Sequence, residues 1–598
     1  MVFCFGGNGL LLAAQILKAK SMEKNILPLC AVFFWANCFA QTPDWSWAKN
    51  IGGPSAISDH GYSIALDDSA NVYTTGTFFG TVDFDPGPGV FNLTQTGMDD
   101  IFISKLDSVG NFRWAKKLGG TGNDIANAIT IDRFGNIYTT GSFAYGAADF
   151  DPGIGTYTLT GTGEMNIFIS KLNRSGNFVW AKQLGGTLPL SSYNQAYGNA
   201  ITVDNSGNVY TTGKFKGSAD FDPGPGTFNM TAPMASIVTN NAFVSKLDSM
   251  GNFVWAINIG TTGEDYGRTI VHDTLGNVYI GGSFTYTFDF DPGPATYNLT
   301  ATNAPGFVLK LDGAGNFISA RNLGGDCYSL KIDVAGNIFY TGSFNGAKDF
   351  DPGLGTFILN GGASSDIFAC KLNDLGNFVW AKRIGGSSSD NGNAIVLDNL
   401  SNVYITGNFN STVDFDPDTG VTNLIPFNGS TDVFVCKLDS SGNFVWAKAA
   451  GGAGGEIGYS IALDAMPNVY ITGHFTSPFS FFGQTILVNT DTVNLNAEIF
   501  IAKLGSTIIT DNNIDEGASN KFFIFPNPVT DEISLEGLGH YASWVEVFDV
   551  TGQKISSLWL NSNKGNSPSI DVTLLPSGIY FIKVYAGKKT VVRKFVKM

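Results

Sequence analysis

Residues that favour β-strands gather in short segments, separated by turns, through most of the chain. The first clear example has four such segments, Ser63–Leu66, Val72–Phe78, Ile101–Leu106 and Phe112–Lys117. They are rich in valine, isoleucine, tyrosine, phenylalanine and threonine, which fit the pleated surface of a sheet. We therefore predict four strands in this stretch.

Two five-residue turns join the predicted strands in pairs. They read Asp-Asp-Ser-Ala-Asn at residues 67–71 and Asp-Ser-Val-Gly-Asn at residues 107–111. The aspartate carboxylate can accept hydrogen bonds from backbone N–H groups of the turn. Glycine adopts the positive φ that matches the strand twist in a hairpin. The four strands are thus predicted to form one antiparallel sheet.

This four-stranded unit recurs along the chain. The fourth strand of each unit carries the sequence Trp-Ala-Lys or a weaker copy of it. These copies begin at Trp47, Trp114, Trp180, Trp255, Ser319, Trp380 and Trp446, so successive copies are 67, 66, 75, 64, 61 and 66 residues apart. The third strand occurs seven times, each time with a phenylalanine near its beginning: Phe102, Phe168, Phe243, Phe307, Phe368, Phe434 and Phe500. The period predicts a propeller, solenoid or other repeat array. Because the first Trp-Ala-Lys strand precedes any complete unit and the last unit lacks one, we predict that the N-terminal strand closes a ring of seven blades.

The predicted fold class is all-β, and the chain divides into four parts. Residues 1–40 are predicted to be a leader with a signal peptide, with Met22 as the expected true start. Residues 41–505 are the seven-bladed β-propeller, 506–521 a polar linker, and 522–598 a small β-sandwich. The apolar stretch of the leader is too short for a transmembrane helix, so no transmembrane segment is expected in the mature chain.

Composition narrows the possible partners. The chain has 598 residues and a formal net charge of −16. An acidic surface repels phosphate backbones, so nucleic-acid binding is not expected. Three cysteines remain beyond the leader, Cys327, Cys370 and Cys436, and their odd number and spacing favour free buried thiols.

Two parts of the chain resemble known families. The pattern Ile-x-x-Asp-x-x-Gly-Asn-Val-Tyr-x-Thr-Gly-x-Phe, followed by Phe-x-x-Lys-Leu-Asp-x-x-Gly-Asn-Phe-x-Trp, resembles the bacterial seven-bladed β-propeller repeat family. The tail contains Phe525-Pro-Asn-Pro-Val529, Val545–Gly552 and Leu575–Tyr580, and it resembles the type A sorting domain of type IX secretion in Bacteroidota. The second resemblance implies that the type IX machinery recognises residues 522–598 and that the protein is secreted or displayed on the outer cell surface.

No catalytic constellation stands out. The four histidines, His60, His272, His474 and His540, fall at unrelated repeat positions, and we interpret them as surface residues. No nucleophile elbow or paired-histidine motif occurs. The recurring tryptophans are interpreted as packing between blades, although they could instead form a platform for stacking sugars.

Paired aspartates exceed what the repeat needs. Asp-Phe-Asp-Pro-Gly or a close copy lies between the second and third strands of six units, at Asp83 and Asp85, Asp149 and Asp151, Asp220 and Asp222, Asp289 and Asp291, Asp349 and Asp351, and Asp414 and Asp416. We predict that these carboxylates face outward and bind calcium, with backbone carbonyls and water completing the shell. The alternative is that each aspartate caps its Pro-Gly turn.

A second acidic column precedes the first strand of most units. Its members are expected on the same rim as the paired aspartates, where they could add a calcium ligand: Asp59, Asp124, Asp265, Asp326, Asp390 and Glu456.

Three functions follow as hypotheses. The leading one is a non-catalytic binding or scaffold protein that recognises a glycan or a protein partner on its loop face. The second is an extracellular polysaccharide-degrading enzyme that uses carboxylates. The third is a structural surface component stiffened by calcium. Catalysis usually breaks repeat symmetry at one site, so the nearly uniform acids favour a non-catalytic protein; unique histidine, arginine or acidic residues at the channel mouth would favour an enzyme.

Overall fold

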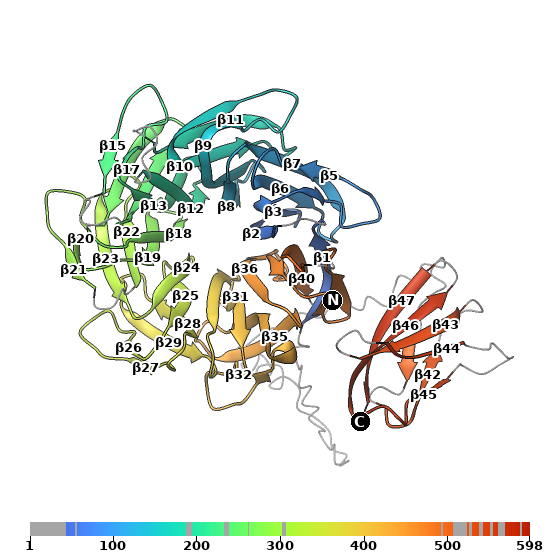
Figure 1. Cartoon of the computed structure of the whole chain (residues 1–598). Coiled ribbons are helices and arrows are strands. Elements are labelled where there is room, and N and C mark those ends of the chain that lie inside the picture. Colours follow the sequence, from blue (N-terminus) through green and yellow to red (C-terminus); the bar gives the residue numbers. More distant parts are fainter. Residues whose placement is uncertain are drawn as a thin grey trace, which may run out of the picture. The chain divides into compact units, whose positions relative to one another are not determined.

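The computed structural model describes residues 43–53, 57–186, 194–232, 239–260, 262–301, 306–491, 494–505, 523–525, 529–536, 542–549, 554–559, 569–586 and 589–597. The predicted leader (1–40) and linker (506–521) lie outside these residues. Within them the structure is almost entirely β (Figure 1), and no helix is long and apolar enough to cross a membrane.

Seven four-stranded blades form the larger part, each written here from the innermost to the outermost strand. Blade 1 contains β2 (His60–Leu66), β3 (Val72–Phe78), β6 (Asp100–Leu106) and β7 (Phe112–Gly120). Blade 2 contains β8 (Asp124–Ile131), β9 (Ile137–Asp149), β10 (Thr158–Leu172) and β11 (Phe178–Leu184). Blade 3 contains β12 (Gln195–Val203), β13 (Val209–Lys216), β16 (Asn241–Leu247) and β17 (Phe253–Ile259).

The remaining blades repeat this order. Blade 4 contains β18 (Tyr266–His272), β19 (Val278–Ser283), β22 (Gly306–Leu311) and β23 (Phe317–Leu323), and blade 5 contains β24 (Asp326–Ile332), β25 (Ile338–Phe344), β28 (Asp366–Leu372) and β29 (Phe378–Ile384). Blade 6 contains β30 (Asn391–Leu397), β31 (Val403–Asn410), β34 (Thr431–Leu438) and β35 (Phe444–Gly452). Blade 7 contains β36 (Glu456–Leu463), β37 (Val469–Phe475), β40 (Glu498–Gly505) and β1 (Asp44–Ile51).

A short hairpin is inserted between the second and third strands of most blades. In blade 2 the long strands β9 and β10 form it themselves. Elsewhere it consists of β4 (Thr81–Asp83) with β5 (Asn92–Thr94), β14 (Ser218–Asp220) with β15 (Asn229–Thr231), β20 (Thr287–Asp289) with β21 (Asn298–Thr300), β26 (Ala347–Asp349) with β27 (Ile358–Asn360), β32 (Val413–Asp414) with β33 (Asn423–Leu424), and β38 (Phe479–Phe482) with β39 (Thr485–Val488). A 3-10 turn, η1 (Phe427–Gly429), precedes β34.

The N-terminal strand completes the last blade. β1 pairs antiparallel with β40 from Asp44 opposite Gly505 to Ile51 opposite Ile499. The innermost strands surround the ring axis, and β36 contacts β2, so that the first and seventh blades meet (Figure 1). The predicted seven-bladed closure is confirmed.

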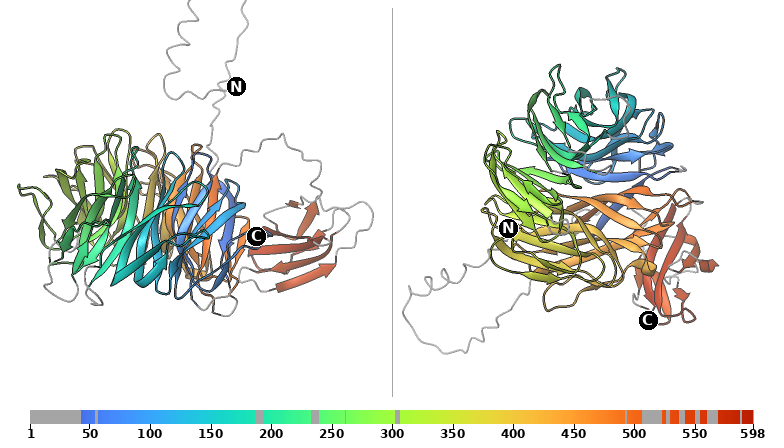
Figure 2. Two further views of the ribbon diagram at one scale, coloured as in Figure 1. Left: turned by 90° about the horizontal axis from the view of Figure 1, so that it is seen from above. Right: turned by 60° about the vertical axis from the view of Figure 1, so that its left-hand side comes forward.

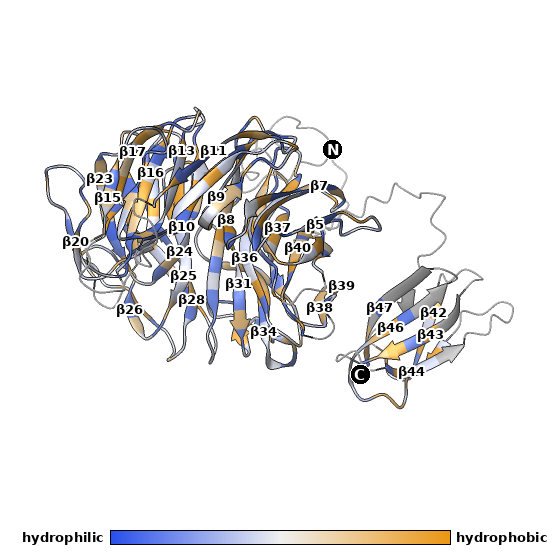
Figure 3. Cartoon of the chain, turned by 45° about the horizontal axis from the view of Figure 1, so that its top comes forward, coloured by the Kyte–Doolittle hydropathy of each residue, from blue (hydrophilic) through white to orange (hydrophobic). Residues whose placement is uncertain are grey.

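The hydrophobic cores lie between the blades. Each of seven clusters of buried side chains draws on two neighbouring blades; one, for example, joins Tyr73 and Ile103 of blade 1 to Phe143 and Phe168 of blade 2. Figure 3 shows hydrophobic residues, in orange, along the strands of the propeller. Since a blade alone leaves both apolar faces in water, burial is complete only in the ring.

The recurring tryptophans also join neighbouring blades, as predicted. The indole of Trp180 in blade 2 donates from Nε1 to the carbonyl oxygen of Ser249 in blade 3 at 3.3 Å. Trp255 and Trp380 make the same bond at 3.3 Å to the next blade, with Gly313 and Ser440. The predicted free buried thiols are confirmed for Cys327, Cys370 and Cys436.

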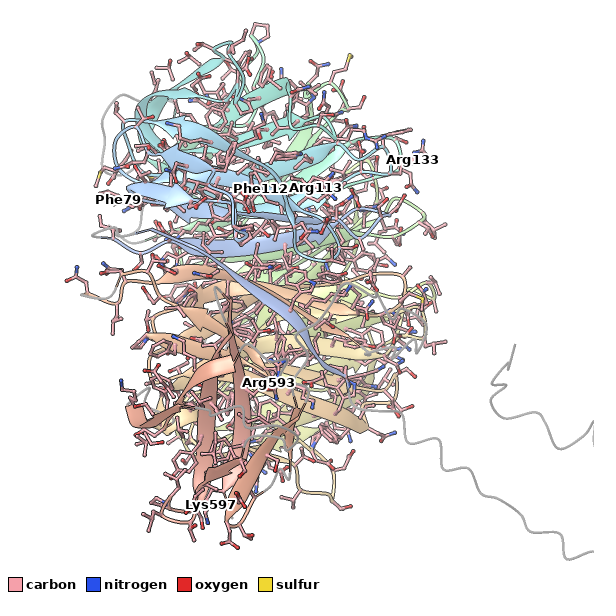
Figure 4. The ribbon with its side chains drawn as sticks, turned by 90° about the vertical axis from the view of Figure 1, so that its right-hand side faces the viewer. Phe79, Phe112, Arg113, Arg133, Arg593 and Lys597 are labelled. Carbon is pink, nitrogen blue, oxygen red and sulfur yellow. The ribbon has the colours of Figure 1, made fainter. Side chains whose placement is uncertain are left out.

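The two faces of the ring carry different connections. Seen edge-on, the strands run between the faces (Figure 2, left). Phe79, which leads into the β4–β5 hairpin, and Arg133, in the turn after β8, lie at opposite ends of the blades (Figure 4). We call the end with the inserted hairpins the hairpin face and the end with the five-residue turns the turn face.

The C-terminal part is a β-sandwich, as predicted. One sheet has the order β41 (Phe523–Phe525), β42 (Glu532–Glu536), β45 (Ser569–Asp571), and the other β44 (Lys554–Trp559), β43 (Ala542–Phe548), β46 (Gly578–Ala586), β47 (Lys589–Lys597). Their facing residues share one core, which includes Ile533, Val545 and Ile582.

Because β1 closes the ring, we expect one of its side chains to contribute strongly to the free energy of unfolding. Ile51 is 1% exposed and packs between blades 7 and 1. Ile51→Ala should lower the free energy of unfolding by ~2–5 kcal/mol, because it leaves a cavity at the seam. Urea unfolding followed by tryptophan fluorescence measures this. Val179→Ala in β11, where the side chain is 44% exposed, is the control and should change it by less than about 0.5 kcal/mol. Equal effects of the two variants would contradict closure by β1.

Candidate functional site

The paired aspartates lie at the inserted hairpins, and the phenylalanine between them anchors each pair. Phe84 is fully buried and contacts Phe78 and Phe102, with ring centroids 5.4 and 5.1 Å apart. Asp83 and Asp85 flank it at the surface of the hairpin. The hairpin also joins blades, since Gly52 at the end of β1 forms an isolated bridge with Asp83.

Each aspartate of a pair organises backbone N–H groups. Oδ1 of Asp83 accepts from the N–H of Asp85 at 3.0 Å and of Phe91 at 2.7 Å, and Oδ1 of Asp85 accepts from Gly87 at 2.8 Å. The first aspartates of the other pairs also accept two N–H groups each: Asp149, Asp220, Asp289, Asp349 and Asp414. The second aspartates each accept from the residue two positions later: Asp151, Asp222, Asp291, Asp351 and Asp416. These contacts are those of turn-capping carboxylates.

The structure does not gather the paired aspartates into a metal cluster. In the described ranges no three His, Cys, Asp or Glu side chains lie together in a way that could hold a metal ion. One oxygen of each carboxylate is taken up by its own turn. This holds for all twelve residues: Asp83, Asp85, Asp149, Asp151, Asp220, Asp222, Asp289, Asp291, Asp349, Asp351, Asp414 and Asp416.

Calcium binding by the pairs stays a prediction. Each hairpin offers two carboxylates whose Oδ1 atoms already accept N–H groups, and calcium prefers six to eight oxygen ligands. A calcium ion would therefore depend on the Oδ2 atoms, backbone carbonyls and water.

The second acidic column is buried and bridges the blades. Asp124, 1% exposed, donates its own N–H to the Asp99 carbonyl oxygen of blade 1 at 2.9 Å. Its carboxylate accepts from the N–H of Gly120, at the end of blade 1, at 2.6 Å, and from Ala144 in its own blade at 3.2 Å. Asp390 and Glu456 accept in the same way from Gly386 and Gly452, both at 2.9 Å. These residues lie at the same end of the blades as the paired aspartates, as expected. They are buried there, and they satisfy backbone groups where the chain crosses between blades.

A third set of buried acids escaped the sequence analysis. Asp100, Asp366, Asp432 and Glu498 stand at or near the start of the third strand in four blades, each at most 3% exposed. Each lies near a member of the second column across the blade boundary: Asp124, Asp390, Glu456 and Asp59 respectively. The available signal was an acid two residues before the phenylalanine in four of the seven runs.

Burial changes the titration of these acids. Burial raises the pKa of Asp432 to about 8, and the charge of Glu456 adds to this effect. Burial likewise raises the pKa of Asp124 and of Asp390 to about 6, despite the N–H groups that stabilise their charged forms. The blade junctions therefore take up protons near neutral pH.

The repeat symmetry breaks around the ring axis at the hairpin face. Every innermost strand has a bulge after its second, third or fourth residue. We call three places in each blade the axial positions: the bulge residue, the residue two before it, and the partner of the latter on the second strand. The bulge residues are Tyr62, Asn127, Asn199, Arg268, Tyr328, Asn393 and Tyr459. This variation is visible in the sequence when the repeats are aligned on the small residue before each bulge residue.

Five axial side chains of blades 3 to 5 form an alternating stack, which we call the axial ladder: Tyr197, Lys214, Tyr266, Arg268 and Tyr328. Nζ of Lys214 lies 4.9 Å from the ring centroids of both Tyr197 and Tyr266. Cζ of Arg268 lies 5.2 Å from the ring of Tyr266 and 5.0 Å from that of Tyr328. All five are half-buried, so each keeps one side toward solvent.

A second cluster occupies the seam between blades 7 and 1. His60 and His474 meet edge to face with centroids 4.7 Å apart, and Tyr62 and Tyr459 pack beside them at 5.4 Å from each other. The interpretation of the histidines as surface residues is wrong for His474, which is 9% exposed. Ring closure brings residues 60 and 474 together, which the linear sequence does not show.

Comparison with known families identifies the two parts of the chain. Residues 113–142, 179–214 and 379–413 match the model described as a β-propeller repeat. Residues 523–598 match the model described as a secretion system C-terminal sorting domain. The predicted repeat family and the predicted type IX sorting domain are thereby confirmed, and the protein is secreted or located at the cell surface.

Individual relatives are distant. The uncharacterized WD repeat-containing protein L264 of Acanthamoeba polyphaga mimivirus is 26% identical over 525 residues, which cover 73% of this chain and 36% of that protein. Sqt1 from Chaetomium thermophilum superposes with a TM-score of 0.35 at 10% identity, over 78% of this chain and 99% of that one. The extracellular domain of BT4673 from B. thetaiotaomicron has a TM-score of 0.21 at 13% identity, over 90% and 68%.

The buried acids predict that stability falls as pH rises through neutrality. An acid with a raised folded pKa binds its proton more tightly when folded, so its stabilisation is present below the unfolded pKa and lost as pH rises through the folded one. For Asp432 this window runs from about 4 to about 8. Urea unfolding between pH 5 and pH 8 should show a decline of ~1.4 kcal/mol per pH unit for each group protonated only in the fold.

Two variants test the assignment of this pH dependence. Asp432→Asn keeps an acceptor for the Phe427 N–H, 2.8 Å away, and should make the decline shallower. Asp374→Asn, at an exposed aspartate of a turn, is the control and should leave the slope as it is. An unchanged slope in Asp432→Asn would contradict the burial argument.

Calcium binding has a direct test in thermal unfolding. If the paired aspartates bind calcium at millimolar affinity, saturating calcium should raise the unfolding midpoint above that in chelator, by linkage. Replacing Asp83 and Asp85 by asparagine should keep the turn and reduce the calcium effect. Identical melting curves in calcium and in chelator would leave these residues as turn caps only.

Proposed function

We propose that this chain, a secreted β-propeller protein with a C-terminal sorting domain, is a non-catalytic binding protein whose ligand contacts the axial positions at the hairpin face. The supporting observation is that repeat symmetry breaks there, in a molecule whose other strand positions are nearly uniform. The surface location given by the sorting domain makes an extracellular glycan or a surface protein the expected class of ligand.

The bulge residues that break the symmetry lack a hydrogen bond that joins the blades elsewhere. In blades 2, 3 and 6 the bulge residue is an asparagine whose Nδ2 donates to a glycine carbonyl of the following blade at 2.9 Å, at Asn127, Asn199 and Asn393. Blades 1, 4, 5 and 7 replace it with Tyr62, Arg268, Tyr328 and Tyr459. Each replacement gives up an inter-blade hydrogen bond worth ~0.5–1.5 kcal/mol. Ring stacking and cation–π contacts of the replacing residues offset part of this loss. Positions that break a local rule of the repeat are typical of functional sites.

A second candidate function, cleavage of a bound glycan, is favoured by the histidine and tyrosine cluster at the same face. The electrostatics of this cluster argue against it. Burial lowers the pKa of His474 to about 3, helped by His60, and burial raises the pKa of Tyr62 above its ordinary value. General acid–base catalysis works best with a pKa near the operating pH, and both shifts move away from it. Binding without cleavage is therefore the better-supported function.

Restoring the repeat's own asparagine tests the proposal. The variant carries Tyr62→Asn, Arg268→Asn, Tyr328→Asn and Tyr459→Asn. These substitutions supply the side-chain amide that donates to the following blade in blades 2, 3 and 6. It should unfold at a midpoint equal to or above that of the wild type and lose ligand on a glycan array and in pull-downs from surface material. Retained binding would place the ligand elsewhere and overturn the proposal. Shortening of the bound glycan by the wild type would favour the enzyme instead.

A further inference from the structure

The axial ladder holds two cations without anionic partners. In the part of the chain that the structure describes, neither Lys214 nor Arg268 has a carboxylate within ion-pair distance, and no hydrogen bond from the Arg268 guanidinium is found. Its Nε atom is buried without an acceptor. Burial lowers the pKa of Lys214, and the nearby charge of Arg268 acts in the same direction against that of Glu264. Both side chains are only partly buried, so the donor atoms that reach solvent can bind an anionic group of a ligand.

The acids around the ladder are already engaged. Glu264 accepts from Nδ2 of Asn240 at 2.7 Å and from the hydroxyl of Tyr266. Glu164 accepts from Nε2 of Gln195 at 2.8 Å. Asp326 is the remaining carboxylate close enough to Arg268 for the cation to lower its pKa, although burial raises that pKa more. These acids, and a chain charge of −16, disfavour densely charged polyphosphates and leave room for a single oxyanion.

We propose that Arg268 binds the oxyanion of an acidic sugar, a carboxylate or a sulfate, whose ring packs on Tyr328 at that end of the axial ladder. This inference rests on the proposed binding function and names its ligand class. The planar guanidinium presents paired N–H donors that match the two oxygens of a carboxylate or sulfate, and Lys214 adds a second charge. Tyr328 ends the axial ladder, so one of its faces is covered by no ladder cation. An apolar ring face with a polar hydroxyl tip suits a sugar ring, which has both apolar and hydroxyl surfaces.

Binding of the full secreted chain to three immobilised polymers tests the assignment: a polyuronate, a sulfated glycosaminoglycan and a neutral glucan. The wild type should bind one or both acidic polymers and not the glucan, and the polymer that binds identifies carboxylate or sulfate as the oxyanion. Arg268→Gln should weaken that binding about 10-fold to 100-fold, the range for a lost hydrogen bond to a charged group. Arg268→Lys keeps the positive charge but lacks the paired donors, so its affinity should lie between those of the wild type and Arg268→Gln.

The matched control is Arg133→Gln, which removes the same charge from the turn face (Figure 4) and should bind as the wild type does. An unfolding midpoint for Arg268→Gln equal to that of the wild type shows that weaker binding is not a loss of fold. Equal binding by Arg268→Gln and wild type, or binding of the glucan as tight as that of the acidic polymers, overturns this inference while the proposed binding function stands. Failure of every polymer to bind, together with pull-downs that the asparagine variant does not change, overturns both.

Discussion

Buried carboxylates that bridge consecutive blades hold the ring together at its hairpin face. Asp124 shows the arrangement, since it accepts N–H groups from Gly120 of one blade and Ala144 of the next. The preceding glycine is required, because a Cβ atom on Gly119 would lie 2.6 Å from Oδ1 of Asp100 and 2.8 Å from Oδ2 of Asp124. The backbone N–H groups at this crossing are thus satisfied within the protein, as they are at Asp390 and Glu456, and the apolar blade faces can close on each other. The same burial couples the ring to pH, because the carboxylates lose solvation when they ionise.

A frame fixed at the blade junctions leaves the axial positions free to differ. Phe102 and its equivalents stay constant because they fill the space between blades, where a change of volume is felt at once. The bulge residues face the ring axis instead, so Arg268 or Tyr328 can stand where other blades have asparagine. Five blades have used that freedom to place aromatic or cationic side chains at one end of the ring. The proposed binding function follows from this contrast between a uniform frame and a varied surface.

The paired aspartates show how a chemical signature can have a structural origin. Carboxylates two residues apart are calcium ligands in many loops, and the sequence pattern invites that prediction. In each hairpin, however, Oδ1 of the first aspartate, such as Asp83, accepts two N–H groups of its own turn. The second aspartate, such as Asp222, Asp291 or Asp416, caps the turn that follows it. Repetition in six blades therefore has a sufficient cause in hairpin geometry, and residues that differ between blades carry more information about function than residues that recur.

The sequence by itself determined the repeat, the seven blades, the closing strand at Trp47 and the C-terminal sandwich, because strand propensity and turn chemistry are local and repeat with the chain. It also determined the export route, through motifs contiguous in the tail. Only the tertiary structure decided which acids are buried and which residues meet across the ring. Asp432 and Glu456, or His60 and His474, lie far apart or in different repeats along the chain, and ring closure brings them together. The axial ladder belongs to this second class, since Lys214 and Arg268 come from different blades and become neighbours only when the blades pack side by side.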